Sequence, residues 1–180
     1  GVEVDSLYTA AITRTIPVDG TFTDAQKKVY QAVLDACEAC LAKAAEIGPD
    51  GERVHFREIH AAAMEVLAHR LDEWGLLPVS AEESLKPEGQ YHRRWMVHGT
   101  SHHLGLDVHD CAQARREMYL DAKLEPGMCF TIEPMVNMGS PAVFTDPEND
   151  WEVYTVDGRP SAQWEIQVLV TEDGTEFSSW

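Results

Sequence analysis

Residues 98–110 hold the densest group of side chains in this sequence that could do chemistry. The segment reads His-Gly-Thr-Ser-His-His-Leu-Gly-Leu-Asp-Val-His-Asp, and it contains four of the chain's eight histidines. Imidazole and carboxylate groups together bind zinc, manganese, iron or cobalt, and a histidine beside a carboxylate often moves protons. The irregular histidine spacing does not follow one helix face, and Gly99 and Gly105 favour a loop. The segment indicates metal-assisted or acid–base chemistry; the alternative is a polar loop whose histidines bond to backbone groups.

Two isolated glutamates are candidates to face this segment. Glu133 ends the apolar run Met128–Glu133, and Glu165 stands near the start of the apolar run Trp164–Thr171. A carboxylate at the tip of a strand that is buried on both faces needs a partner for its charge. We interpret both glutamates as ligand candidates, with the alternative that Glu133 only caps a turn.

The elements that must position these groups follow from hydrophobic periodicity and turn residues. Capping-box spacing at Thr23 marks the start of the first helix. In chain order we expect two strands within residues 1–18, the second over 12–16; helices over 24–47 and 55–74; a loop over 78–91; a strand over 128–133; a loop over 138–160; and a strand over 164–171. His55, His60 and His69 lie on the second helix, where we expect surface or cap residues and not ligands.

Composition and charge exclude several classes of protein. The chain has 14 basic and 31 acidic residues and a formal net charge of −17, which opposes binding to nucleic acid or anionic membranes. No apolar run is long enough to span a membrane and no signal-peptide pattern opens the sequence, so we expect a cytoplasmic protein. Four scattered cysteines predict free thiols in a reducing compartment, with Cys37 and Cys40 as packing residues.

Several motifs resemble those of the pita-bread metallopeptidases, which include Xaa-Pro aminopeptidase and methionine aminopeptidase. The segments similar to the Xaa-Pro branch are residues 12–17, 98–110 and 124–128, whereas residues 130–138 and 157–165 are similar to the methionine branch. The chain thus resembles a hybrid of the two. The resemblance implies an α+β fold with a curved antiparallel sheet flanked by helices. Residues 1–180 would form a single partial domain that lacks the upstream part.

The resemblance also implies a site for divalent metal, with manganese, cobalt, zinc or iron as the expected ion. His102, Glu133 and Glu165 match the histidine and the two glutamates that hold metal in the family, and Glu133 is also a possible proton shuttle. His98 and His109 match histidines that line the site and contact substrate, so we count them with Glu133 as catalytic candidates. His103 matches a non-ligand position, where a packing or hydrogen-bonding role is expected.

Two aspartate ligands of the family pattern have no match. Ala11 stands where a metal-bridging aspartate is expected, and the other aspartate would precede Gly1. One histidine and two carboxylates can hold a single ion with an open position for water. We therefore expect one weakly bound ion or none. The expected partners are a peptide and either a second copy of the chain or a complementary chain that supplies the upstream part.

Two functions follow from the resemblance. The first is a metal-dependent aminopeptidase of the Xaa-Pro or methionine type, in which a metal-activated water attacks the first peptide carbonyl. The second is a catalytically inactive relative or engineered fragment that acts as a peptide-binding or assembly module. Ala11 discriminates between them, because an aspartate there would favour the enzyme.

Overall fold

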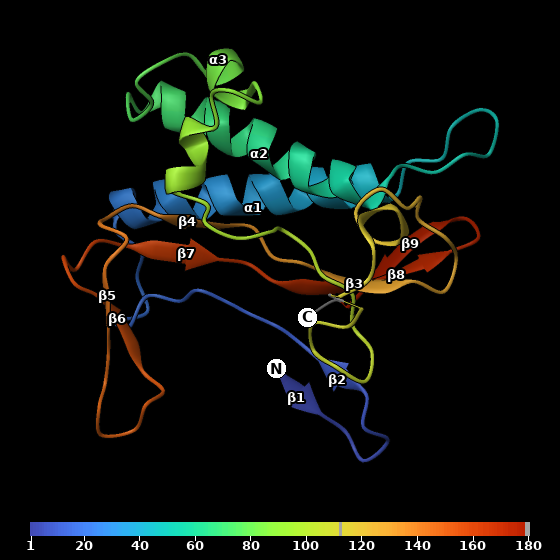
Figure 1. Ribbon diagram of the computed structural model, residues 1–180. Helices are drawn as coiled ribbons and strands as arrows, with labels where there is room; N and C mark the ends of the chain where they lie inside the picture. The colour runs from blue at the N-terminus through green and yellow to red at the C-terminus, as the bar shows by residue number, and fades with distance from the viewer. Residues whose placement is uncertain (112, 179–180) are drawn as a thin grey trace.

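The computed structural model describes residues 1–111 and 113–178, which form a layer of helices over a layer of strands. The two long helices, α1 (Asp24–Ala44) and α2 (Phe56–Glu73), lie side by side on one face of the strand layer (Figure 1). Shorter helical segments follow at α3 (Ala81–Leu85), η1 (Tyr91–Arg94) and η2 (Arg116–Met118). None of the described helices combines the length and the apolar character needed to cross a membrane.

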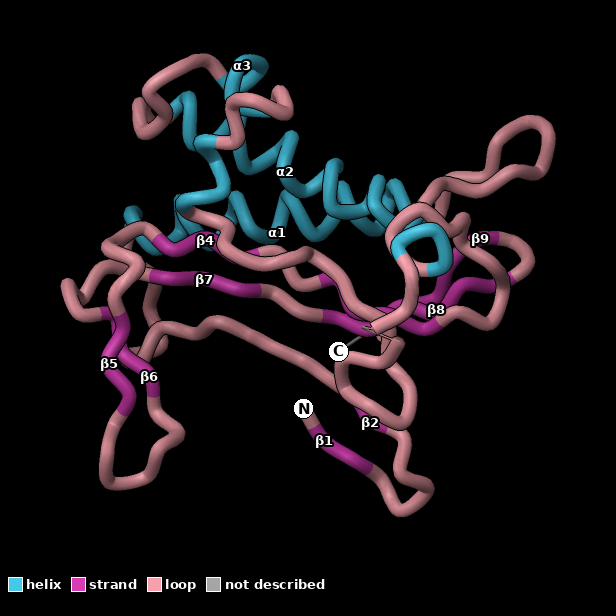
Figure 2. Tube along the Cα trace, in the orientation of Figure 1, coloured by secondary structure: helices cyan, strands magenta, loops and turns pink. Residues whose placement is uncertain are grey.

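The strands are short and antiparallel, and long connections separate several of them (Figure 2). They are β1 (Val2–Glu3), β2 (Thr9–Ala10), β3 (Cys129–Ile132), β4 (Met135–Asn137), β5 (Val143–Thr145), β6 (Val153–Thr155), β7 (Ser161–Gln163), β8 (Ile166–Thr171) and β9 (Gly174–Phe177). β3, β8 and β9 form a three-stranded sheet with β8 in the centre, and β4 pairs with β7. β1–β2 and β5–β6 form separate pairs that project from the side opposite the helices (Figure 1).

Residues 129–137 pair with residues 161–169 in two ladders, and the pairing is interrupted between the two. Ile132 pairs with Ile166 at the end of the β3–β8 ladder, and Met135 pairs with Gln163 at the start of the β4–β7 ladder. The two residues between the ladders on each segment are therefore outside the regular pairing. Both candidate glutamates occupy these positions, so the interruption brings them to the same part of the sheet.

The core lies between the helices and the strands. Large side chains that are almost completely buried come from both layers: Ile59, Leu67, Leu71, Phe130, Ile132, Val136, Val168 and Val170. The ring of Phe56 at the start of α2 also meets the ring of Phe130 edge to face, with centroids 5.3 Å apart. Burying each such side chain contributes about 1.5–3 kcal/mol. This interface therefore holds the helices against the sheet and stabilises the strands that carry the site.

The cysteines behave as the sequence predicts. All four are free thiols, and Cys37 and Cys40 are buried on the face of α1 that joins the core. Burial raises the pKa of the Cys37 thiol to about 12, so it stays protonated and packs as an apolar group. A redox role for this pair finds no support in the geometry.

Both long helices and the strands next to the glutamates are confirmed. The capping box at Thr23 is also confirmed: its Oγ1 accepts from Gln26 N–H at 3.3 Å, and Gln26 Oε1 accepts from Thr23 N–H at 2.8 Å. The helix over 24–47 ends at Ala44, and the helix over 55–74 spans Phe56–Glu73.

Four sequence-based expectations are wrong. The strand over 12–16 is reduced to one backbone bridge, between Thr13 and Glu165. At the next paired position the Thr15 hydroxyl takes the place of its backbone: Oγ1 donates to the Gln163 carbonyl at 3.0 Å and accepts from the Gln163 N–H at 2.9 Å. The loops over 78–91 and 138–160 contain α3 and the β5–β6 hairpin. His60 is not a surface or cap residue, since its imidazole points from α2 to a hydrogen bond with Thr100. His69 is exposed, as expected.

The capping box gives a testable contribution to stability. Thr23→Ala removes the acceptor for the Gln26 N–H, and we expect the free energy of unfolding to fall by about 1 kcal/mol. Urea denaturation measures this change. Thr21→Ala, at an exposed position just before the cap, is the matched control and should change stability by less than about 0.5 kcal/mol. Equal effects of the two substitutions would contradict the capping role.

Candidate metal centre

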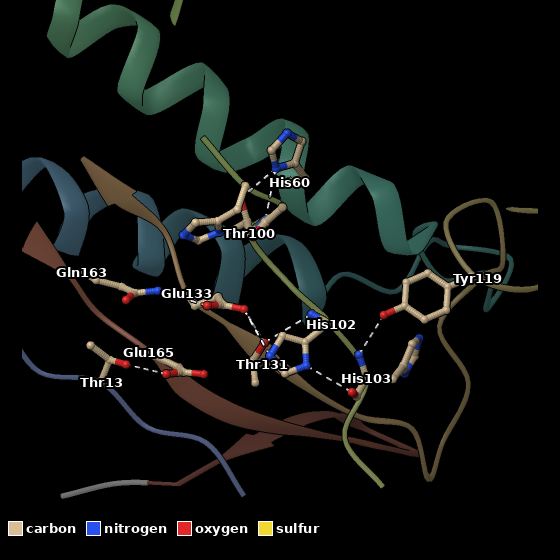
Figure 3. Close-up of polar contacts among 12 residues, drawn as sticks. Thr13, His60, Thr100, His102, His103, Tyr119, Thr131, Glu133, Gln163 and Glu165 are labelled. Carbon is tan, nitrogen blue, oxygen red and sulfur yellow. Dashed lines mark hydrogen bonds and ion pairs between the residues drawn. The ribbon is translucent and has the colours of Figure 1, made fainter. Parts of the chain in front are cut away.

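Three side chains that are distant in the sequence converge at the interruption of the sheet. Ligand atoms of His102, Glu133 and Glu165 all lie within 4.8 Å of one another (Figure 3). His102 Nε2 lies 3.2 Å from Glu133 Oε1. The side chains of His102 and Glu133 are 12% and 15% exposed, and Glu165 is 6% exposed. The group is thus nearly enclosed but still reachable from solvent.

Backbone pairing brings the histidine segment to β3. Residues 100–104 run antiparallel to β3, because Thr131 N–H donates to His102 C=O at 2.8 Å and Glu133 N–H donates to Thr100 C=O at 2.7 Å. These bonds are two residues apart on each segment, as in an antiparallel ladder. The segment therefore acts as an additional strand, which fixes the position of His102 relative to Glu133.

A second backbone contact fixes Glu165. The N–H of Glu165 donates to the carbonyl of Thr13 at 3.0 Å, at the one bridge that the N-terminal segment makes with this part of the sheet. Glu165 directly precedes β8, which pairs with β3. The site is therefore built across adjacent segments of one antiparallel arrangement, and each ligand candidate comes from a different segment.

Neutral donors hold the two carboxylates. Glu133 Oε2 accepts from Gln163 Nε2 at 3.0 Å, and Glu133 Oε1 accepts from Thr131 Oγ1 at 3.3 Å. Glu165 Oε2 accepts from Thr13 Oγ1 at 2.5 Å (Figure 3). These side-chain donors are neutral, whereas the charged guanidinium of Arg14 donates to the backbone carbonyl of Glu165 at 2.6 Å.

The orientation of His102 suits metal binding. Its Nδ1 lies 3.1 Å from the carbonyl of His103, so Nδ1 carries the proton in the neutral ring and Nε2 faces the glutamates. Burial opposes protonation, but hydrogen bonds with Glu133 and with the His103 carbonyl, together with the charges of both glutamates, outweigh it and raise the pKa of His102. The raised pKa shows that the carboxylates favour positive charge at this point.

The donor set fits a divalent cation. One imidazole nitrogen and two carboxylates are ligands of zinc, manganese, iron and cobalt. Metal–ligand bonds of about 2.0–2.2 Å place adjacent ligand atoms about 3–3.5 Å apart. The 3.2 Å separation of His102 Nε2 and Glu133 Oε1 falls in this range. Ala11, which is 5% exposed, adds no ligand atom to the three groups.

The other three histidines of the segment differ in how close they lie to the ligand candidates. The exposed ring of His109 meets the ring of His102 edge to face, with centroids 4.5 Å apart, so it borders the site. His98 Nδ1 lies 2.6 Å from the carbonyl of Gly99. Among the described residues, no hydrogen bond or ion pair joins His98 to the three ligand candidates. His103 has the packing role expected of it: its ring stacks on Phe56 at 4.5 Å.

The sequence reasoning missed the residues that orient the carboxylates. Thr131 and Gln163 stand two positions before Glu133 and Glu165, and alternate residues of a strand share a face. This periodicity was a usable signal for both. The contact of Thr13 with Glu165 spans 152 positions and has no comparable local signal.

Comparisons with known proteins identify the family of the chain. Residues 1–172 match the metallopeptidase family M24. Xaa-Pro aminopeptidase 1 of Streptomyces coelicolor is 50% identical over 134 residues, which cover 74% of this chain and 26% of that protein. Methionine aminopeptidase of Chlamydia muridarum is 58% identical over 54 residues, which cover 30% of this chain and 19% of that protein.

The fold of the chain matches that of a solved aminopeptidase. A solved structure of an alanine variant of Escherichia coli aminopeptidase P matches with a TM-score of 0.74 and 30% identity, over 95% of this chain and 34% of that one. The chain thus spans only 19–34% of the length of these three proteins. The α+β, pita-bread expectation is confirmed, and the chain belongs to the metallopeptidase family M24.

Proposed function

We propose that this chain carries the metal-binding part of an aminopeptidase that removes the N-terminal residue of peptides with proline in second place. The convergence of His102, Glu133 and Glu165 is the observation that carries this proposal. The preference for proline is supported by the larger share of the chain that is similar to an Xaa-Pro aminopeptidase, 74% against 30% for a methionine aminopeptidase.

The three ligand candidates have separate roles in this proposal. His102 and Glu165 hold a manganese, cobalt, zinc or iron ion, and Glu133 holds the ion and receives a proton from the attacking water. When bound, the ion would polarise the scissile carbonyl and make that water more acidic. Because Gln163 and Thr131 fix both oxygens of Glu133, its carboxylate is oriented before substrate arrives.

The remaining candidates contact the peptide. His109 borders His102 and is exposed, so we assign it to substrate positioning. We assign His98 the polarisation of the substrate, on the strength of the family resemblance. The excess of acidic residues, which gives a formal net charge of −17, favours the free amino group of a peptide over its carboxylate end. A location in the cytoplasm belongs to the same proposal.

A second candidate function is a peptide-binding module without turnover. Ala11 favours it, because this buried position supplies no carboxylate to bridge two ions. A single weakly held ion would lower the population of active sites. Binding of the peptide without hydrolysis in the wild-type chain would support this alternative over the peptidase.

Metal stoichiometry tests the incomplete ligand set. We expect the wild-type chain to bind about one manganese ion weakly, and Ala11→Asp to bind at least about tenfold more tightly, equivalent to about 1.4 kcal/mol. Isothermal titration calorimetry measures both values. Ala10→Asp is the control, because Ala10 ends β2, where it pairs with Val2, and is less buried than Ala11. Two tightly bound ions in the wild type, or no gain with Ala11→Asp, would contradict the ligand count.

Hydrolysis tests the role of Glu133. We expect a peptide with proline in second place to be cleaved faster than one that begins with methionine and lacks proline. Glu133→Gln keeps the size of the side chain but removes its charge, and it should lower the rate at least about 100-fold. Glu125→Gln, at an exposed turn, is the matched control. Faster cleavage of the methionine peptide would contradict the substrate assignment. Hydrolysis by Glu133→Gln at the wild-type rate would contradict the proton-transfer role.

We also propose that a second polypeptide, another copy or a complementary chain, covers part of the surface. The β5–β6 hairpin and its connecting loop expose Phe144 (53%), Trp151 (85%) and Tyr154 (51%). We take these three side chains, which belong to one hairpin, as the candidate contact surface, because contiguous exposed apolar patches mark interaction sites.

Association is measured by sedimentation velocity. We expect the purified chain to sediment as a dimer or larger species at micromolar concentration, because association removes these apolar surfaces from water. Trp151→Ser should weaken the association, whereas Tyr91→Ser, at an exposed position on η1, should not. A monomer at all concentrations would leave only the complementary chain as partner.

A further inference from the structure

A link runs from helix α2 to the backbone of a ligand candidate. His60 Nδ1 lies 2.8 Å from Thr100 Oγ1, and the N–H of Thr100 donates to the same Nδ1 at 3.3 Å. The carbonyl of Thr100 accepts from Glu133 N–H at 2.7 Å. His60 thus contacts the hydroxyl and the amide N–H of Thr100 (Figure 3). The carbonyl of the same threonine holds the backbone of Glu133.

We propose that His60 is a positioning residue of the metal centre, which acts through Thr100 to fix the backbone of Glu133 and the segment that carries His102. The proposal rests on the metal site described under the proposed function. Among the described residues, no hydrogen bond joins His60 to any of the three ligand candidates, so its influence passes through Thr100.

Burial makes this link important. Thr100 is completely buried, so its hydroxyl and amide groups cannot exchange a lost partner for water without a local rearrangement. The position of Thr100 matters equally, since it lies between His98 and His102 in the sequence. A shift of Thr100 would move the histidine segment and the end of β3 together.

The geometry also assigns the tautomer of His60. A backbone N–H can only donate, so Nδ1 must be an unprotonated acceptor, and the Thr100 hydroxyl donates to it as well. The proton of the neutral ring is then on Nε2. Burial, followed by the positive charge of Arg93, lowers the pKa of His60, which agrees with a neutral ring.

Two substitutions separate positioning from simple packing. His60→Leu keeps the bulk but removes the acceptor, whereas His60→Asn retains an acceptor near the place of Nδ1. His69→Leu is the matched control, because it makes the same change at an exposed position of the same helix. Nitrogen-15 NMR of the imidazoles in the wild-type chain reports the tautomer independently of any variant.

The first readout is amide hydrogen exchange in the metal-free chain. In His60→Leu we expect about tenfold faster exchange at Thr100 and Glu133, while Val170, which donates to Met128 in the same sheet, stays unchanged. The second readout is cobalt affinity by calorimetry, which should fall at least about tenfold in His60→Leu. His60→Asn should recover most of both losses, and His69→Leu should show neither.

Three results would overturn the proposal: a proton on Nδ1 of His60, equal exchange changes throughout the sheet, or His60→Asn as defective as His60→Leu. Failure of the wild-type chain to bind cobalt would instead sink the proposed function. The exchange and tautomer measurements would still decide whether His60 positions Thr100 and Glu133.

Discussion

The antiparallel pairing of residues 100–104 with β3 is the constraint on which the site depends. It places His102 beside the end of β3, where Glu133 follows directly. The pairing of β3 with β8 then brings Glu165 to the same level. Since backbone hydrogen bonds define each of these positions, the ligand candidates do not rely on flexible loops for their alignment.

The interruption between the two ladders gives the carboxylates room to turn toward the histidine. The carboxylates of Glu133 and Glu165 repel each other at this distance. Hydrogen bonds from Thr13, Thr131 and Gln163 offset that repulsion. These three donors are neutral, and the positive charge of Arg14 lies close to the backbone carbonyl of Glu165. The raised pKa of His102 reflects the negative charge of the two carboxylates acting on a proton.

Parts of this arrangement could be read from the sequence, and others required the folded chain. Glu133 and Glu165 were found because a carboxylate beside an apolar run is unusual, and the resemblance to a family joined them to His102. Both long helices carry a strong periodic signal. The β5–β6 hairpin does not, because it projects from the sheet and exposes Phe144 and Tyr154 on its two strands.

The errors have physical causes. The β-branched run at residues 12–16 suits a strand, but only Thr13 makes a backbone bridge, because Thr15 bonds to Gln163 through its side-chain hydroxyl. Helix α3 has a local signal in Ser80, whose Oγ accepts from Glu83 N–H, though its five residues are too few for a periodic pattern. The link from His60 to Thr100 depends on how α2 lies against the histidine segment, which no local pattern encodes.

The central claim is that one imidazole and two carboxylates hold a single divalent ion. X-ray absorption at the zinc edge of the zinc-loaded chain measures these ligands directly. We expect one imidazole together with oxygen ligands at about 2.0–2.2 Å. Two or more imidazoles, or a sulfur ligand at about 2.3 Å, would contradict the assignment of His102, Glu133 and Glu165 as the metal centre.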